Sequence, residues 1–130
     1  MAKRTLLVVD DEKILRLLRD YLKAAGYRVL TACDGCQALA LARQAQPDLI
    51  VLDVMLPGID GFEVCQALRS EGSRVPVVML TARVRDGDRE MALALGVAEF
   101  VEKPFSPREL VGRVHELLEG GRLAESQVAG

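Results

Sequence analysis

The 130-residue chain lacks several features that mark particular classes of protein. It has no excess of positive charge, which a nucleic-acid surface needs, because 17 Lys and Arg stand against 19 Asp and Glu. Its three cysteines are odd in number and too few for a disulfide scaffold, which favours a reducing compartment. No apolar run approaches the ~20 residues of a membrane-spanning helix or the ~7–15 of a secretory signal. We therefore expect a cytoplasmic domain that binds neither a membrane nor, by itself, nucleic acid.

Short apolar runs are what the chain has in abundance. Half of its residues are hydrophobic, which is enough to bury one core in a domain of this length. Five runs rich in Val, Leu and Ile predict strands: Leu6–Val9, Arg28–Ala32, Leu49–Leu52, Val75–Leu80 and Val97–Val101. Most of these runs are continuous rather than alternating, as in strands that are buried on both faces of a parallel sheet.

The segments between the runs have apolar residues at helical spacing. The apolar face predicted for the first helix consists of Ile14, Leu17, Leu18, Tyr21 and Leu22. The pattern at Ser106 and Glu109 predicts a capping box at the start of the last helix. A strand–helix unit that occurs five times predicts an α/β fold, a doubly wound parallel sheet with helices on both faces. We expect residues 1–120 to form one domain and residues 121–130 a linker stub or a disordered tail.

Chemically distinctive residues follow four of the five predicted strands. Asp10 and Asp11 follow the first strand, Asp53 the third, Thr81 the fourth and Lys103 the fifth. Because the carboxyl ends of parallel strands meet at one edge of the sheet, where ligands bind, we expect these side chains to converge. Each residue alone is more often a turn former, a cap or solvated surface. Their occurrence at four separate strand ends favours a common site.

The residue types at this site indicate phosphoryl-transfer chemistry. Crowded carboxylates repel one another, which raises their pKa values or requires a cation. Oxygen donors without His or Cys nearby suit Mg²⁺, with Mn²⁺ as a substitute. A carboxylate left over from metal binding can attack a phosphoryl group and form an acyl phosphate. The metal and Lys103 would neutralise the oxygens of the transferred group, and the hydroxyl of Thr81 would donate to one of them.

These residues lie in stretches that resemble the receiver domains of two-component response regulators. The matching stretches are Leu6–Glu12, Val51–Gly61, Met79–Ala82 and Lys103–Phe105. The resemblance covers about residues 4–119, and it implies a flavodoxin-like sheet with the strand order 2-1-3-4-5. It also implies that Asp53 is the phosphoacceptor. The implied magnesium ligands are the carboxylates of Asp10, Asp11 and Asp53 and the backbone carbonyl of Met55.

The function implied by the resemblance is a signalling switch, not an enzyme that acts on separate substrates. A sensor histidine kinase or a phosphotransfer protein would donate the phosphoryl group to Asp53. Thr81 and Lys103 would follow the new group, and Phe100 matches an aromatic switch position that rotates into the space left by Thr81. The face formed by the fourth helix, fifth strand and fifth helix would then change its affinity for a partner or an output domain.

One further stretch, Pro104–Leu110, resembles regulators whose output is a winged-helix DNA-binding domain. The receivers of such regulators dimerise through charged residues on the output face. The matching charges here are Arg89, Glu99, Glu109 and Arg113. Ala98 departs from that pattern, since an aspartate is usual there, and exposed ion pairs are weak in any case. We expect dimerisation to depend on phosphorylation.

Three other functions remain open on the sequence. A phosphatase with Asp53 as its nucleophile would have a second acid where Met55 stands. A flavin or nucleotide binder would need a first loop rich in Gly, Ser or Thr, and Asp10 and Asp11 would repel its phosphate without a metal. A protein–protein adaptor that is never phosphorylated would leave the acidic residues without a role.

Two further signals are weak. Cys33 and Cys36 have the spacing of a redox or zinc motif, but a structural zinc site needs four ligands and no second pair follows. His115 is the only histidine, and general acid–base catalysis would require a partner within reach.

Overall fold

The structure is a computed structural model that describes residues 3–120. The strands are β1 Thr5–Val9, β2 Arg28–Ala32, β3 Leu49–Asp53, β4 Val77–Thr81 and β5 Glu99–Glu102. The helices are α1 Glu12–Ala24, α2 Gly35–Ala45, α3 Gly61–Ser70, α4 Asp88–Ala94 and α5 Pro107–His115, and a short π-helix, η1 Glu116–Gly120, follows α5. The predicted tail, 121–130, lies outside the described residues.

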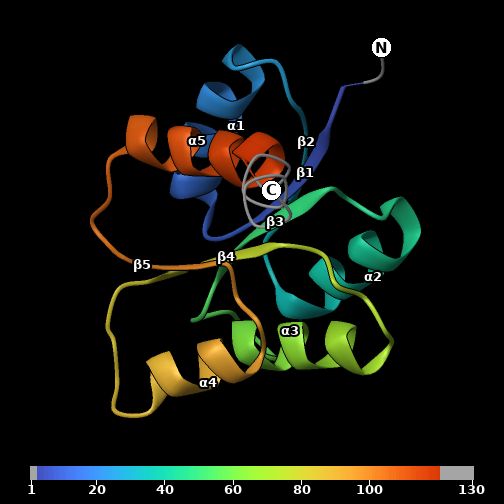
Figure 1. Cartoon of the computed structure of the whole chain (residues 1–130), viewed down its shortest axis with the longest axis vertical. Helices are drawn as coiled ribbons and strands as arrows, with labels where there is room; N and C mark the ends of the chain where they lie inside the picture. Colours follow the sequence, from blue (N-terminus) through green and yellow to red (C-terminus); the bar gives the residue numbers. More distant parts are fainter. Residues whose placement is uncertain (1–2, 121–130) are drawn as a thin grey trace, which may run out of the picture.

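The sheet confirms the predicted fold class. Its strands are all parallel and have the order β2-β1-β3-β4-β5 (Figure 1). Helices α1 and α5 cover one face, while α2, α3 and α4 cover the other. Among the described residues, none of the helices is both long enough and apolar enough to cross a membrane.

The side chains of each strand contribute to two hydrophobic cores, one on each face of the sheet. Successive side chains of a strand point to opposite faces of the sheet. In β1, Leu7 and Val9 therefore pack with α2 and α3, whereas Leu6 and Val8 pack with α1 and α5. The central strands β1, β3 and β4 are buried on both faces, which explains their continuous apolar sequences.

The predicted inner face of α1 is partly wrong. The structure buries Leu15, Leu18 and Leu22, and it leaves Leu17 43% and Tyr21 37% exposed. The row that begins at Leu15 and the row that begins at Ile14 both have a spacing of three or four residues. Periodicity alone therefore does not decide which row faces the sheet. Contact with the sheet selects the row that contains Leu15.

Two smaller predictions also differ from the structure. Strands β4 and β5 begin at Val77 and Glu99, two residues later than expected from Val75 and Val97. The carbonyl of Val75 is occupied by a side chain, and the N–H of Val97 closes the end of α4 on Ala92. At the start of α5, Ser106 accepts the Glu109 N–H but a full capping box does not form, whereas Asp60 and Glu63 form one with both bonds at the start of α3.

Candidate functional site

The carboxyl ends of β1, β3, β4 and β5 bring the expected residues to one edge of the sheet. The register pairs Val9 with Leu52, Asp53 with Leu80, and Thr81 with Glu102, so the strands end at nearly the same level. Lys103 Nζ lies 3.0 Å from Asp10 Oδ1 and 3.3 Å from Asp53 Oδ2. Residues from three strand ends thus form one charged cluster.

Asp10 is the least solvated member of this cluster. Its side chain is fully buried, and burial is the largest cause that raises its pKa from 3.8 to about 6. The Asp53 carboxylate raises this pKa further, whereas the Asp11 N–H and Lys103 lower it. Oδ1 accepts both the Asp11 N–H at 2.7 Å and Lys103, but the buried Oδ2 has no hydrogen-bond partner. A buried carboxylate oxygen without a partner is costly unless a cation or water occupies it.

Lys103 is the positive member of the cluster. Burial lowers the pKa of its ammonium, but hydrogen bonds and charges from Asp10 and Asp53 outweigh burial and raise it. Strand β5 places the residue at this edge, and the peptide bond Lys103–Pro104 that follows is cis. One ammonium against two carboxylates leaves the cluster with a net negative charge.

The donor set of the cluster suits a magnesium ion. Asp11 is exposed, and its Oδ1 caps α1 by accepting the N–H groups of Lys13 and Ile14. Within residues 3–120, no three His, Cys, Asp or Glu side chains form a metal-binding group. Mg²⁺ commonly takes one or two carboxylates and keeps several waters. The orphaned oxygen of Asp10 and the carboxylate of Asp53 meet that requirement.

The loop after β3 holds Asp53 in place. Asp53 is 6% exposed, and its Oδ1 accepts the N–H of Met55 at 3.2 Å. The N–H of Gly61 returns to the carbonyl of Val54 at 2.8 Å and closes the loop against the strand. A Cβ at position 61 would lie 2.4 Å from the carbonyl oxygen of Asp53. Only glycine therefore allows this approach, a requirement that the sequence alone did not reveal.

Thr81 and Phe100 lie beside this edge. Thr81 is fully buried, and its hydroxyl donates to the carbonyl of Arg83 at 2.8 Å and accepts the Arg83 N–H at 3.2 Å. Phe100 is half-buried and stacks on Phe62 with a centroid distance of 6.4 Å. The guanidinium of Arg89 lies 5.5 Å from the centre of the Phe100 ring. The hydroxyl of Thr81 is thus engaged with its own loop.

Three of the four charges predicted for a dimer have partners within the chain. Arg113 Nη1 lies 3.1 Å from Glu99 Oε1, and Arg89 stacks on Phe100. Both arginines are exposed, so these contacts are weak and can be exchanged.

The weaker sequence signals lie outside the cluster. Cys33 and Cys36 are exposed and unpaired thiols. His115 does have a partner, since its Nδ1 lies 3.2 Å from the hydroxyl of Tyr27. Tyr27 precedes β2, at the opposite end of the sheet from Asp53.

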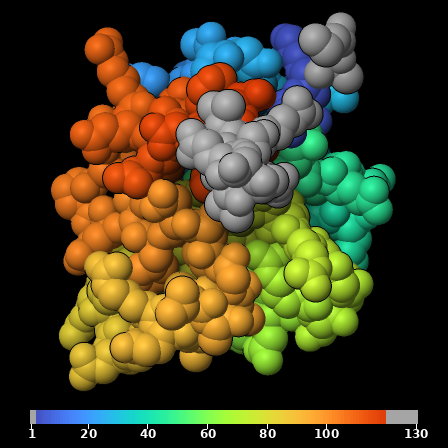
Figure 2. All heavy atoms as spheres, in the orientation of Figure 1, coloured from blue at the N-terminus to red at the C-terminus, as the bar shows by residue number. Residues whose placement is uncertain are grey.

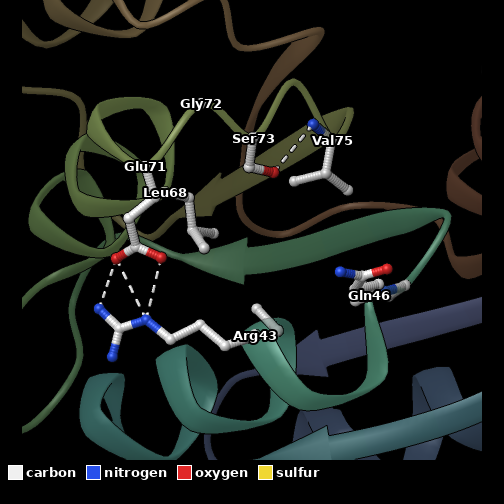
Figure 3. Close-up of a pocket in the computed structure, with 9 residues that line it drawn as sticks. Arg43, Gln46, Leu68, Glu71, Gly72, Ser73 and Val75 are labelled. Carbon is white, nitrogen blue, oxygen red and sulfur yellow. Dashed lines mark hydrogen bonds and ion pairs between the residues drawn. The ribbon is translucent and has the colours of Figure 1, made fainter.

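The hollow in Figure 3 is also remote from the acidic cluster. It has a volume of about 380 Å³ and lies between the C-terminal ends of α2 and α3, next to Pro47 and Val75. The exposed ion pair of Arg43 and Glu71 crosses it. These residues precede β3 and β4, whereas Asp53 ends β3.

Comparison with known proteins agrees with the fold. Residues 6–115 match the family model described as the response regulator receiver domain. The chain therefore belongs to the response regulator receiver domains, the phosphorylation-dependent signalling switches of two-component systems.

The relatives that match along most of the chain are regulators of transcription. The chain is 47% identical over 124 residues to the alkaline phosphatase synthesis transcriptional regulatory protein PhoP of Bacillus subtilis, covering 95% of this chain and 52% of that protein. It is 45% identical over 115 residues to the transcriptional regulatory protein BaeR of Escherichia coli, covering 88% of this chain and 48% of that protein. The chain spans about half the length of the curated relatives it matches.

Solved structures with a similar fold are receivers as well. The chemotaxis protein CheY4 of Vibrio cholerae is 34% identical, with a TM-score of 0.82 over 88% of this chain and 98% of that chain. The receiver domain of the Francisella response regulator 1452 is 32% identical, with a TM-score of 0.85 over 92% of this chain and 99% of that chain.

Proposed function

We propose that Asp53 is the residue that accepts the phosphoryl group and that Asp10, Asp11, Asp53 and the carbonyl of Met55 hold Mg²⁺. The observation that carries this proposal is the buried oxygen of Asp10, which lacks a partner in a cluster that also contains the carboxylate of Asp53 and the ammonium of Lys103. Asp11 would give up part of its capping role or contribute its second oxygen. When bound, the metal supplies positive charge to the oxygens of the transferred group.

The side chains of the cluster have distinct tasks in this mechanism. Asp53 uses one carboxylate oxygen to attack phosphorus, so that an O–P bond of an acyl phosphate forms as the P–N bond of the donor's phosphohistidine breaks and that histidine leaves. Lys103 already contacts the other carboxylate oxygen, so its ammonium stands where the new negative charge develops. The hydroxyl of Thr81 leaves Arg83 and donates to a phosphoryl oxygen, and Phe100 turns inward as Thr81 moves.

The partners of this switch follow from the same chemistry. A sensor histidine kinase or a phosphotransfer protein is the proposed donor. Self-dephosphorylation, in which water takes the phosphoryl group from Asp53 and inorganic phosphate leaves, returns the domain to its resting state. We place this exchange in the cytoplasm. The output face is the surface of α4, β5 and α5, which carries the charges of Arg89, Glu99, Glu109 and Arg113.

The relatives suggest what that face controls. They are named as transcriptional regulators and are about twice as long as this chain. We propose that the whole protein is a transcriptional regulator with a winged-helix DNA-binding output domain and that its receiver dimerises when phosphorylated. The linker proposed for residues 121–130 would join the two parts.

Mass spectrometry after incubation with acetyl phosphate and Mg²⁺ tests the proposal. We expect one added phosphoryl group on the native chain and none on Asp53→Asn. Asp20→Asn is the matched control, because Asp20 is exposed on α1 and contacts only its neighbour Arg19. Modification that persists in Asp53→Asn would remove Asp53 from its role. Steady release of phosphate from small phosphomonoesters would instead favour a phosphatase.

A further inference from the structure

Arg69, at the end of α3, has an unusual set of partners. Its guanidinium donates only to backbone carbonyls: Leu95 at 2.8 Å, Val75 at 2.9 Å, Ser73 at 3.2 Å and Gly96 at 3.4 Å. Among the described residues no carboxylate pairs with it, and the side chain is half-buried. One side chain therefore joins the end of α3, the start of β4 and the end of α4.

The carbonyls at the end of α4 explain why an arginine suits this place. The last carbonyls of a helix lack partners within the helix and carry partial negative charge. Leu95 is the C-cap of α4 and Gly96 follows it, and Arg69 donates to both of their carbonyls. The planar guanidinium supplies several donors in fixed directions, which a lysine ammonium does not.

The opposite end of α4 is held much less firmly. Gly87 is the N-cap, it has φ of 85°, and it makes no side-chain capping bond. The preceding segment is mostly exposed, and Ala92 is the one buried residue that α4 itself contributes. Figure 2 shows α4 at the edge of the molecule, next to α3. At the N-terminal end the contacts are the exposed bond from the Arg85 N–H to Asp88 and the stacking of the exposed Arg89 on Phe100. The helix is thus held more firmly at its C-terminal end, where Arg69 donates to two carbonyls, than at its N-terminal end.

The less firmly held end is the one that leads to the functional site. Thr81 ends β4, and its hydroxyl holds the first turn of the segment 82–87 through Arg83. If Thr81 turns toward a phosphoryl group, these two bonds break and the segment is released. We propose that Arg69 is the fixed pivot about which α4 then rotates, so that movement at Thr81 becomes reorientation of the output face. This proposal rests on the proposed function.

Hydrogen exchange by mass spectrometry tests whether Arg69 holds the C-terminal end of α4 in the unphosphorylated chain, a contact called the resting clamp below. The amides of residues 95–97 bond to carbonyls in α4 and report on its last turn. We expect their exchange to rise about tenfold in Arg69→Gln and less in Arg69→Lys, which keeps the charge and one donor. Arg74→Gln is the matched control, because Arg74 is exposed in the loop that follows α3 and its replacement removes the same charge. Exchange that is equal in Arg69→Gln and Arg74→Gln would overturn the proposal.

Fluoroberyllate with Mg²⁺, used as a phosphoryl mimic, tests the pivot. In the native chain, the mimic should change the rate of amide hydrogen exchange in residues 82–91 and leave that of residues 95–97 unchanged. In Arg69→Gln, the rate should change in both segments. We also expect the gain in dimerisation on phosphorylation to fall about fivefold in Arg69→Gln, with Asp53 still fully modified. Equal changes at both ends of native α4, or an undiminished gain in the variant, would overturn the pivot. A native chain that takes up no fluoroberyllate would refute the proposed function, while the resting clamp would still be judged by the first measurement.

Discussion

The substitution Lys103→Met provides a quantitative test of the acidic cluster. Methionine keeps the length of the side chain but removes the ammonium that lies against Asp10 and Asp53, whose side chains are 0% and 9% exposed. Removing one partner from a buried ion pair typically costs about 3–5 kcal/mol, because the remaining charge has no compensation. The side chain of Lys103 is itself only 14% exposed, so solvent replaces little of what is lost.

Protonation sets an upper limit on this cost. A carboxyl whose ordinary pKa is 3.8 can be neutralised at pH 7 for about 4.4 kcal/mol and at pH 5 for about 1.6 kcal/mol. We therefore expect Lys103→Met to lower the free energy of unfolding by about 2–4 kcal/mol at pH 7 and by about 1 kcal/mol at pH 5.

The sign of this pH dependence follows from the pKa of Asp10. Its pKa is raised in the folded chain, and loss of Lys103 raises it further, so the folded state binds more protons than the unfolded state above pH 3.8. Stability of the variant therefore falls as pH rises from about 4 toward 7. Urea unfolding at pH 5 and pH 7 measures the difference.

A control variant and a cation complete the test. Lys13→Met removes an exposed lysine from α1, and we expect a change within about 0.5 kcal/mol at both pH values. Mg²⁺ should restore more stability to Lys103→Met than it adds to the native chain. The reasoning would be refuted if Lys103→Met lost no more than Lys13→Met, or if its loss were the same at both pH values.

Three further predictions concern the loop after β3, the metal and the output face. Gly61→Ala should lower the free energy of unfolding by about 1–3 kcal/mol in urea titrations, because the new Cβ meets the Asp53 carbonyl. Gly112→Ala, whose Cβ would meet nothing within 4 Å, should stabilise by about 0.5–1 kcal/mol, and equal effects of the two would contradict the close approach. Millimolar Mg²⁺ should raise the Tm of the native chain in thermal scans and that of Asp10→Asn much less, so an equal shift would count against Asp10 as a ligand. Arg113→Ala should change stability by less than about 1 kcal/mol, since its pair with Glu99 is exposed, yet weaken phosphorylation-dependent dimerisation in light scattering. A dimer unaffected by that change would exclude Arg113 from the interface.

The edge of the sheet that carries the site could be predicted because the order and direction of the strands alone determine which residues lie there. Parallel strands end at one edge whatever their exact register, so Asp10, Asp53 and Lys103 had to converge once the strands were recognised. Small errors in the starts of β4 and β5 did not matter, because the functional residues follow the strand ends.

Features that depend on three-dimensional neighbours were not predictable in the same way. The inner face of α1 was misassigned because Ile14 and Leu15 begin two equally regular rows. Arg69 gave no signal, since a half-buried arginine that bonds only to carbonyls has the same local sequence as an exposed one. The carboxylate of Asp11 caps α1, a role that the sequence left open beside the expected role in metal binding.

A crystal structure of the chain with Mg²⁺ and fluoroberyllate would test the central claim most directly. The account predicts fluoroberyllate on the carboxylate of Asp53 and a metal ion about 2.0–2.1 Å from oxygens of Asp10 and Asp53. It also predicts that the hydroxyl of Thr81 has left Arg83 for the bound group. Fluoroberyllate on another residue, or a metal that leaves Oδ2 of Asp10 without a partner, would contradict it.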